Sequence, residues 1–304
     1  LVLGLSTSST RRPETSHQFI RDGTLAPFST KCADSVALSR SVAFHRKGAY
    51  REAYRILRDF IARHPDLRYG DAYVHCANLE LLVNDDPSKA GEFLDTALRL
   101  GCDNMAHYYC MSGYVFHRMG QRERGVREME RAVDLEPSAY TLSMLAATLS
   151  FDGDTRAADI WKRVLEQEPL NCKARVGLGI LAAKTGNREE ALRMARIAET
   201  LDPNARDLAD IAELYAEAGE TRIALSKYAE VDRRGGASNG PVYARMAVCY
   251  FELANYREGC KYLEEGCRLF PNSVSIKEAW DLYRDRYSRA KLENAGDSQC
   301  ATMV

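Results

Sequence analysis

The chain has 304 residues, of which 45% are hydrophobic and 28% charged, and its 42 basic and 43 acidic side chains leave a net charge of −1. This balance excludes bulk electrostatic attraction to nucleic acid or to an anionic membrane, and no apolar run reaches the ~18–20 residues that span a bilayer. The nine cysteines are scattered without a Cys-x-x-Cys pair, so they indicate neither a disulfide framework nor a zinc knuckle, and we expect a reducing intracellular compartment.

Residues 1–33 are predicted to form an extended or disordered arm. The first part of this segment is rich in Ser and Thr, has more Arg than acidic residues, and shows no helical period. Its composition resembles the remnant of an organellar transit segment. Two locations therefore stay open at this point: the mitochondrion or another organelle, and the cytoplasm.

From residue 34 to residue 271, two series of residues recur with a period of about 34. The first series consists of prolines that lie one or two periods apart: Pro65, Pro137, Pro169, Pro203 and Pro271. The second consists of small residues and has no gap: Ala53, Ala90, Gly125, Ala157, Ala191, Ala224 and Gly259. Two periodicities in phase predict a repeat array, and this period is typical of stacked helix pairs.

The segment 106–137 shows the repeating unit most clearly. A helix is predicted over 107–119 and ends at Gly120. A second helix over 122–135 is followed by Pro137, which cannot continue it. Two helices joined by a short turn approach closely only where bulky side chains are missing. We therefore expect Gly113 and Gly125 to provide the space at the crossing.

This unit resembles the tetratricopeptide repeat, in which a small residue, an aromatic residue, a turn glycine, a second small residue and a closing proline follow one another. The first copy matches with Ser41, Phe44, Gly48, Ala53 and Pro65, and the fifth with Gly179, Gly186, Ala191, Ala198 and Pro203. The second and fourth copies are degenerate. The resemblance implies an all-α, right-handed α-solenoid of about seven helix pairs over 34–271, whose first helices line a concave surface.

The pattern changes after Pro271. Ile276, Trp280, Tyr283 and Tyr287 form one apolar stripe, whereas the opposite face is charged. This one-sided helix, 272–294, is suited to covering the exposed face of the last repeat as a C-terminal capping helix. The final residues, 295–304, are predicted to be a flexible tail.

The resemblance to the family implies a partner-binding groove on the concave surface. When the fold is projected onto the chain, apolar residues dominate that surface, with three His and Cys side chains near them. The expected groove residues are Leu38, Val42, His75, Leu79, Leu82, Cys110, Tyr114, His117, Leu142, Leu149, Val176 and Ile180. The groove's occupant is expected to be a peptide or helix of a protein partner, or the chain's own N-terminal arm.

The sequence contains no glycine-rich phosphate loop, nucleophile elbow or paired-histidine zinc helix. His75, His107 and Cys110 offer zinc-type ligands, but histidines that merely line the groove are the favoured interpretation, so we expect no catalytic residue, cofactor or metal.

The leading hypothesis is a non-enzymatic protein–protein interaction scaffold or adaptor in a larger complex, such as an accessory or assembly subunit. The alternative is an RNA-binding helical-repeat protein of an organellar ribonucleoprotein, which the neutral charge argues against.

Overall fold

The computed structural model describes residues 36–64, 69–201, 203–233 and 239–283. The predicted arm and tail, Tyr287 and the side chain of Leu38 lie outside the described residues. The described chain is helical, without a strand, and its helices are α1 (Val36–Arg46), α2 (Tyr50–Arg63), α3 (Gly70–Val83), α4 (Pro87–Leu100), α5 (Met105–Arg118), α6 (Arg122–Leu135), α7 (Ala139–Asp152), α8 (Arg156–Gln167), α9 (Cys172–Lys184), α10 (Arg188–Glu199), α11 (Ala205–Glu217), α12 (Thr221–Arg233), α13 (Gly240–Glu252), α14 (Tyr256–Leu269) and a helical segment at 274–283.

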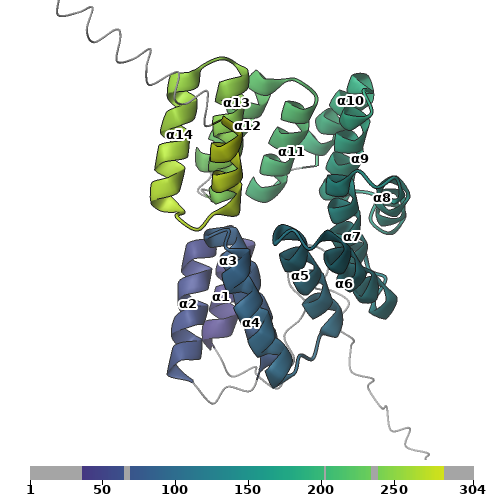
Figure 1. The fold of residues 1–304 in the computed structure, drawn as a ribbon. Helices are drawn as coiled ribbons and strands as arrows, with labels where there is room; N and C mark the ends of the chain where they lie inside the picture. The colour runs from purple at the N-terminus through teal and green to yellow at the C-terminus, as the bar shows by residue number, and fades with distance from the viewer. Residues whose placement is uncertain (1–35, 65–68, 202, 234–238, 284–304) are drawn as a thin grey trace, which may run out of the picture.

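Consecutive helices pack as seven pairs, from α1 with α2 to α13 with α14, and each pair also packs on the next (Figure 1). The chain is thus the all-α solenoid of helix pairs that the repeat predicts. At the crossing of α5 and α6, a side chain at Gly113 would lie 2.7 Å from the backbone oxygen of Gly125. The turn between these helices contains Gly120 at φ +80°, a left-handed conformation that glycine adopts without strain.

Short polar residues begin many of the helices. The side chain of Asn104 accepts a hydrogen bond from the backbone of His107, and Asn171 does the same for Ala174. Ser138 and Thr141 form a reciprocal capping box at the start of α7. These contacts satisfy backbone donors that the first turn of a helix leaves without partners, which fixes where each helix starts.

The helical segment 274–283 covers the last pair. Ile276, Ala279 and Tyr283 are buried against α13 and α14, and the ring of Tyr283 stacks on Phe251 with centroids 4.5 Å apart. This is the capping helix that the apolar stripe predicts. No helix of the described ranges is both long and apolar enough to cross a membrane.

The solenoid curves until its two ends meet. In Figure 1 the pairs run round a circuit, and the yellow-green α14 returns to the side of the blue helices α2 and α3. Contacts across this seam include Ser273 with Asp85, at 2.7 Å, and the guanidinium of Arg51 over the ring of Phe270, at 5.2 Å. The described helices therefore form a closed ring, with the first helix of each pair toward its inside.

Candidate functional site on the inner face of the ring

Several residues expected to line an apolar groove belong to the core instead. Leu79, Cys110, Leu142, Leu149 and Val176 are at most 2% exposed. The reason is that first helices pack on one another as well as on their own partners, as α5 with α7 and α7 with α9 do. A partner cannot reach these five side chains in this structure, so their assignment to an open groove is corrected to interhelical packing.

The other expected groove residues are only partly accessible. Val42, Leu82, Tyr114 and Ile180 are half-buried, so these four side chains retain some exposed surface. They are spread over four first helices and do not form a continuous apolar surface with the five core residues. An apolar groove of the expected extent is therefore not formed by the described side chains.

The histidines make separate contacts. The ring of His75 stacks on His45 with centroids 5.2 Å apart, and its Nε2 lies 3.4 Å from Ser41 Oγ. His117 Nε2 lies 3.0 Å from Asp152 Oδ1. No three His, Cys, Asp or Glu side chains come together to hold a metal ion in the described part of the chain. His75, His107, Cys110 and His117 are therefore not brought into one site.

A column of residues at matching positions of four successive first helices marks the inner face. This inner column consists of His107, Tyr140, Lys173 and Arg206, each near the start of its helix. Tyr140 OH lies 3.1 Å from His107 Nδ1, so adjacent members contact each other across the pair boundary. The column changes from neutral to cationic side chains along the ring.

The cationic end of the column has charges without ion-pair partners. Among the described residues, Lys173 and Arg206 form no ion pair, and the Lys173 Nζ contacts only the Met144 sulfur, at 3.9 Å. Asp210, one turn after Arg206, likewise forms none. In contrast, Arg245 on α13 pairs with Glu213 and Glu217 of α11. Lys173, Arg206 and Asp210 are all half-buried, so they keep surface that a ligand can reach.

Burial shifts the protonation of these groups. Burial raises the pKa of Asp210 to about 6, although the nearby charges of Arg206 and Lys173 act in the opposite direction. Burial, with a smaller contribution from the charge of Arg206, lowers the pKa of Lys173 to about 8. Charged groups in a poorly solvated, concave place are typical of binding sites, because a ligand of opposite charge replaces the missing water.

Arg206 also acts across the ring. Its charge is a contributor, after burial, to the low pKa of His45 on α1, and it interacts with Tyr50 at the start of α2. Helices α1 and α11 belong to the first and sixth pairs and do not pack along their lengths. Arg206 therefore influences the protonation of groups in the first pair, although its helix does not pack on theirs.

Burial keeps the thiols and the His107 imidazole of this face neutral. Burial raises the pKa of the Cys110 and Cys172 thiols to about 12, so neither supplies a thiolate nucleophile at neutral pH. His107 has its pKa lowered to about 4 by burial and stays neutral. What remains is two cations and a carboxylate that are able to form charge-assisted hydrogen bonds with a polar ligand.

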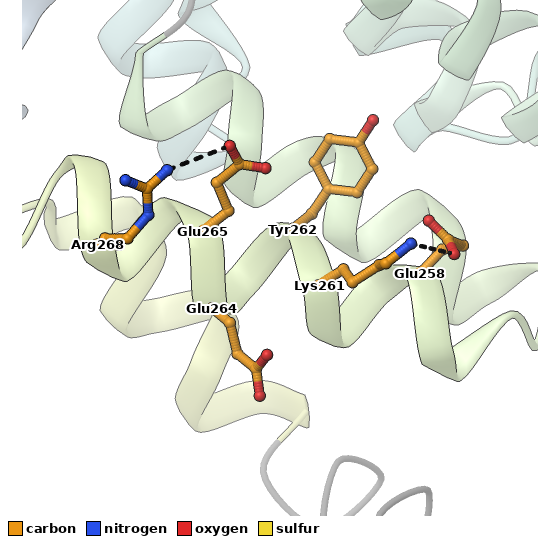
Figure 2. A pocket seen from close by; sticks show the side chains of 6 residues that line it. All are labelled: Glu258, Lys261, Tyr262, Glu264, Glu265 and Arg268. Atoms are coloured by element: carbon orange, nitrogen blue, oxygen red, sulfur yellow. Dashed lines mark hydrogen bonds and ion pairs between the residues drawn. The ribbon is translucent and has the colours of Figure 1, made fainter. Parts of the chain in front are cut away.

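A second hollow lies on α14 (Figure 2). It is lined by Glu258, Lys261, Tyr262, Glu264, Glu265 and Arg268. Lys261 pairs with Glu258 at 3.0 Å, and Arg268 pairs with Glu265 at 3.6 Å, both within the same helix. Pairs of this kind in solvent contribute little energy and offer no buried group for recognition. We therefore place the candidate site on the inner face.

The sequence prediction missed Lys173 and Asp210, and it treated Arg206 only as part of a charged end of the groove. The signal was present, because 107, 140, 173 and 206 are 33 residues apart, like the repeat itself. A search for charge at matching repeat positions would have found the column. The apolar residues one or two turns further along each first helix are more numerous, so the prediction of the groove was based on them.

The sequence profile of the tetratricopeptide repeat matches residues 106–138 and 240–273. No curated protein matches the chain significantly. Three solved structures share the architecture of this chain at low sequence identity. At such identities the similarity shows the fold alone.

The first is a tetratricopeptide repeat protein from Parabacteroides merdae, 15% identical with a TM-score of 0.52, for which the match covers 81% of this chain and 96% of that one. The second is the APC/C hetero-tetramer Cut9–Hcn1, 15% identical with a TM-score of 0.51, covering 83% of this chain and 49% of that one. The third is a thermophilic TPR protein from Thermus thermophilus, 18% identical with a TM-score of 0.50, covering 62% and 99%.

The fold and the matched repeats define the class: an α-solenoid of stacked helix pairs with a capping helix at its end. Within that class, the profile matches lie in the third and seventh pairs. The chain therefore contains tetratricopeptide repeats at 106–138 and 240–273, and it shares its fold with solved tetratricopeptide-repeat proteins.

Proposed function

We propose that this protein is a non-enzymatic protein–protein interaction scaffold that binds a polar segment of a protein partner on its inner face. The observation that supports this most is the set of half-buried charges at Lys173, Arg206 and Asp210, which form no ion pair among the described residues. Buried charges are costly unless a partner group compensates them. A ligand that brings complementary charge is therefore favoured at this place.

The partner segment is expected to be polar and to contain at least one acidic side chain. A carboxylate between Lys173 and Arg206 would accept hydrogen bonds from both, each worth ~1.5–3 kcal/mol for a charged group. A segment that matched the expected apolar groove would instead bury these cations against hydrocarbon. A role as an accessory or assembly subunit of a larger complex is in keeping with the fold shared with the APC/C hetero-tetramer Cut9–Hcn1.

Affinity purification with an inner-face variant tests the proposal. The wild type and the double variant K173A/R206A would be purified from the source organism, and the co-purifying chains quantified by mass spectrometry. We expect the double variant to lose one or more stoichiometric protein partners, because two charge-assisted contacts are removed at once.

The matched control is K162A on α8, which removes an exposed lysine whose only ion pair is with Asp159. It should retain every partner. If K173A/R206A also retains them all, the inner face is not the binding surface. If the lost material is RNA that ribonuclease removes, the alternative of an RNA-binding repeat protein replaces the proposal.

A further inference from the structure

The ends of the ring are joined by a cluster of polar contacts, the Asp85 latch, which consists of Asp85, Arg118, Ser273 and Ser275. The backbone N–H of Val274 also donates to the backbone oxygen of Asp85, at 3.2 Å. Asp85 Oδ2 accepts hydrogen bonds from Ser273 Oγ at 2.7 Å and from the backbone N–H of Ser275 at 2.9 Å. Asp85 Oδ1 accepts from the guanidinium of Arg118 at 2.7 Å. The carboxylate therefore joins the second pair, the third pair and the capping segment, which lies about 190 residues further along the chain.

Asp85 occupies a position where other pairs have glycine. It is in the turn between the two helices of its pair, with a left-handed φ of +53°. The turn glycines with positive φ in other pairs are Gly48, Gly120, Gly153, Gly186 and Gly219. Asp tolerates this conformation less well than Gly does. The feature that distinguishes Asp85 from the glycines is its carboxylate, which is fully buried in the latch.

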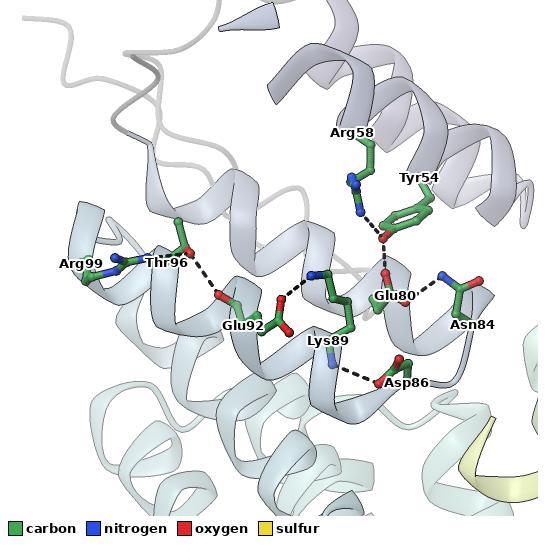
Figure 3. A network of polar contacts seen from close by, with 9 residues as sticks. All are labelled: Tyr54, Arg58, Glu80, Asn84, Asp86, Lys89, Glu92, Thr96 and Arg99. Atoms are coloured by element: carbon green, nitrogen blue, oxygen red, sulfur yellow. Dashed lines mark hydrogen bonds and ion pairs between the residues drawn. The ribbon is translucent and has the colours of Figure 1, made fainter. Parts of the chain in front are cut away.

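The turn that carries Asp85 is fixed by its own pair and by α2 of the first pair (Figure 3). Asn84 Nδ2 donates to Glu80 Oε1 at 2.7 Å, and the hydroxyl of Tyr54 on α2 donates to the same carboxylate. On the other side, Asp86 accepts from the backbone N–H of Lys89 at 3.0 Å and so caps α4. With both neighbours engaged, the Asp85 side chain is preorganised to meet the capping segment.

The rest of the seam is small. Apart from the latch, Arg51 lies over the Phe270 ring, and Gly240 makes room for Ser273, whose Oγ would be 2.2 Å from an added Cβ. The first two pairs do not pack along their lengths on α13 or α14. In contrast, consecutive pairs pack helix on helix, as α2 does on α3 and α12 on α13. Small polar interfaces within one chain are the ones that separate most easily.

We propose that the Asp85 latch is a reversible closure of the ring, and that its release opens the seam and exposes the inner face to macromolecules. The proposal depends on the seam and not on the identity of any partner. It goes beyond the proposed scaffold function, because a ring that stayed shut would limit what can reach Lys173 and Arg206.

The variant D85G tests the closure. Glycine is the residue that other pairs have at this turn, so the pair should keep its fold while the carboxylate is lost. We expect hydrogen exchange in the segment 274–283 to become about tenfold faster, because the amide of Ser275 and the hydroxyl of Ser273 lose their carboxylate acceptor, and only the bond from the Val274 amide to the backbone oxygen of residue 85 remains. Exchange in α7 to α9, far from the seam, should not change.

The second readout is the reaction of Lys173 with a bulky amine reagent, measured by mass spectrometry relative to the exposed Lys162. Opening of the ring should raise this ratio in D85G but not in the control variant E123Q, which removes an exposed carboxylate of α6. If D85G proves poorly helical, D85N takes its place, since it keeps the side chain's shape and removes its charge. Wild-type exchange and Lys173 reactivity in a folded variant would overturn the proposal.

Discussion

At the scale of single residues, the inner face combines groups that water would normally surround. Burial lowers the pKa of Lys173 and raises that of Asp210, and both shifts favour the neutral form of the side chain. His45, on α1, is only 2% exposed. Among the residues that the structure describes, neither ring nitrogen of His45 has a hydrogen-bond partner. Such positions are unfavourable for folding alone, which is the pattern expected where a binding surface sets the residue type.

His45 gives the protein a definite dependence of stability on pH. Burial, with help from the charge of Arg206, lowers its pKa from 6.5 to about 3. Between these values the unfolded chain binds the proton more readily than the folded one. The stability that the folded chain has while His45 is neutral is therefore fully present above pH 6.5, and it is lost as the pH falls toward 3. Between pH 7 and pH 5 we expect a loss of about 2 kcal/mol from His45.

Urea unfolding of the wild type and of H45F at the two pH values measures this loss. Phenylalanine keeps a ring against His75 but cannot take up a proton. The variant should therefore lose less unfolding free energy between pH 7 and pH 5 than the wild type does, although buried His107, whose pKa is about 4, still contributes in both. Equal losses in the two proteins would show that His45 does not bind its proton preferentially in the unfolded state.

At the scale of helices, the repeat period was sufficient to predict the pairs but not which apolar residues face outward. Gly113 and Gly125 do face each other at the crossing of α5 and α6, as local steric reasoning requires. Leu79 and Leu142 were expected in a groove and are instead buried between helices. A first helix is contacted on several sides, so its apolar residues look alike in sequence whether they pack or stay open.

The close approach of α5 and α6 at Gly113 predicts that a larger side chain there lowers the stability of the protein. G113A would place a methyl group 2.7 Å from the backbone oxygen of Gly125, which cannot move without shifting α6. We expect a loss of ~1–3 kcal/mol of unfolding free energy, as for other overpacked cores. Chemical denaturation followed by circular dichroism provides the measurement.

The control is G91A in the interior of α4, where an added methyl group would meet only Val115, at 3.8 Å. Here alanine should stabilise the protein by ~0.5–1 kcal/mol, because it lowers the entropy cost of forming the helix without a clash. If both variants changed stability in the same direction, close approach at the α5–α6 crossing would not be what selects glycine.

At the scale of the whole molecule, the closed ring was beyond the reach of sequence analysis. Curvature accumulates from a small rotation at each pair, and a repeat pattern does not give the size of that rotation. The latch joins Asp85 to residues almost the length of the repeat array away. The one local signal was an Asp at a turn position that is glycine in most other pairs. That substitution is meaningful only once its partner across the seam is known.

Small-angle X-ray scattering of the wild-type protein tests the central claim most directly, because both the inner face and the latch depend on ring closure. The account predicts a compact profile whose pair-distance distribution matches a closed circuit of seven helix pairs, independent of protein concentration. A longer maximum dimension, as expected for an open superhelix with separated ends, would contradict it. Arg206 and His45 would then lie apart, and the inner face would not exist as one site.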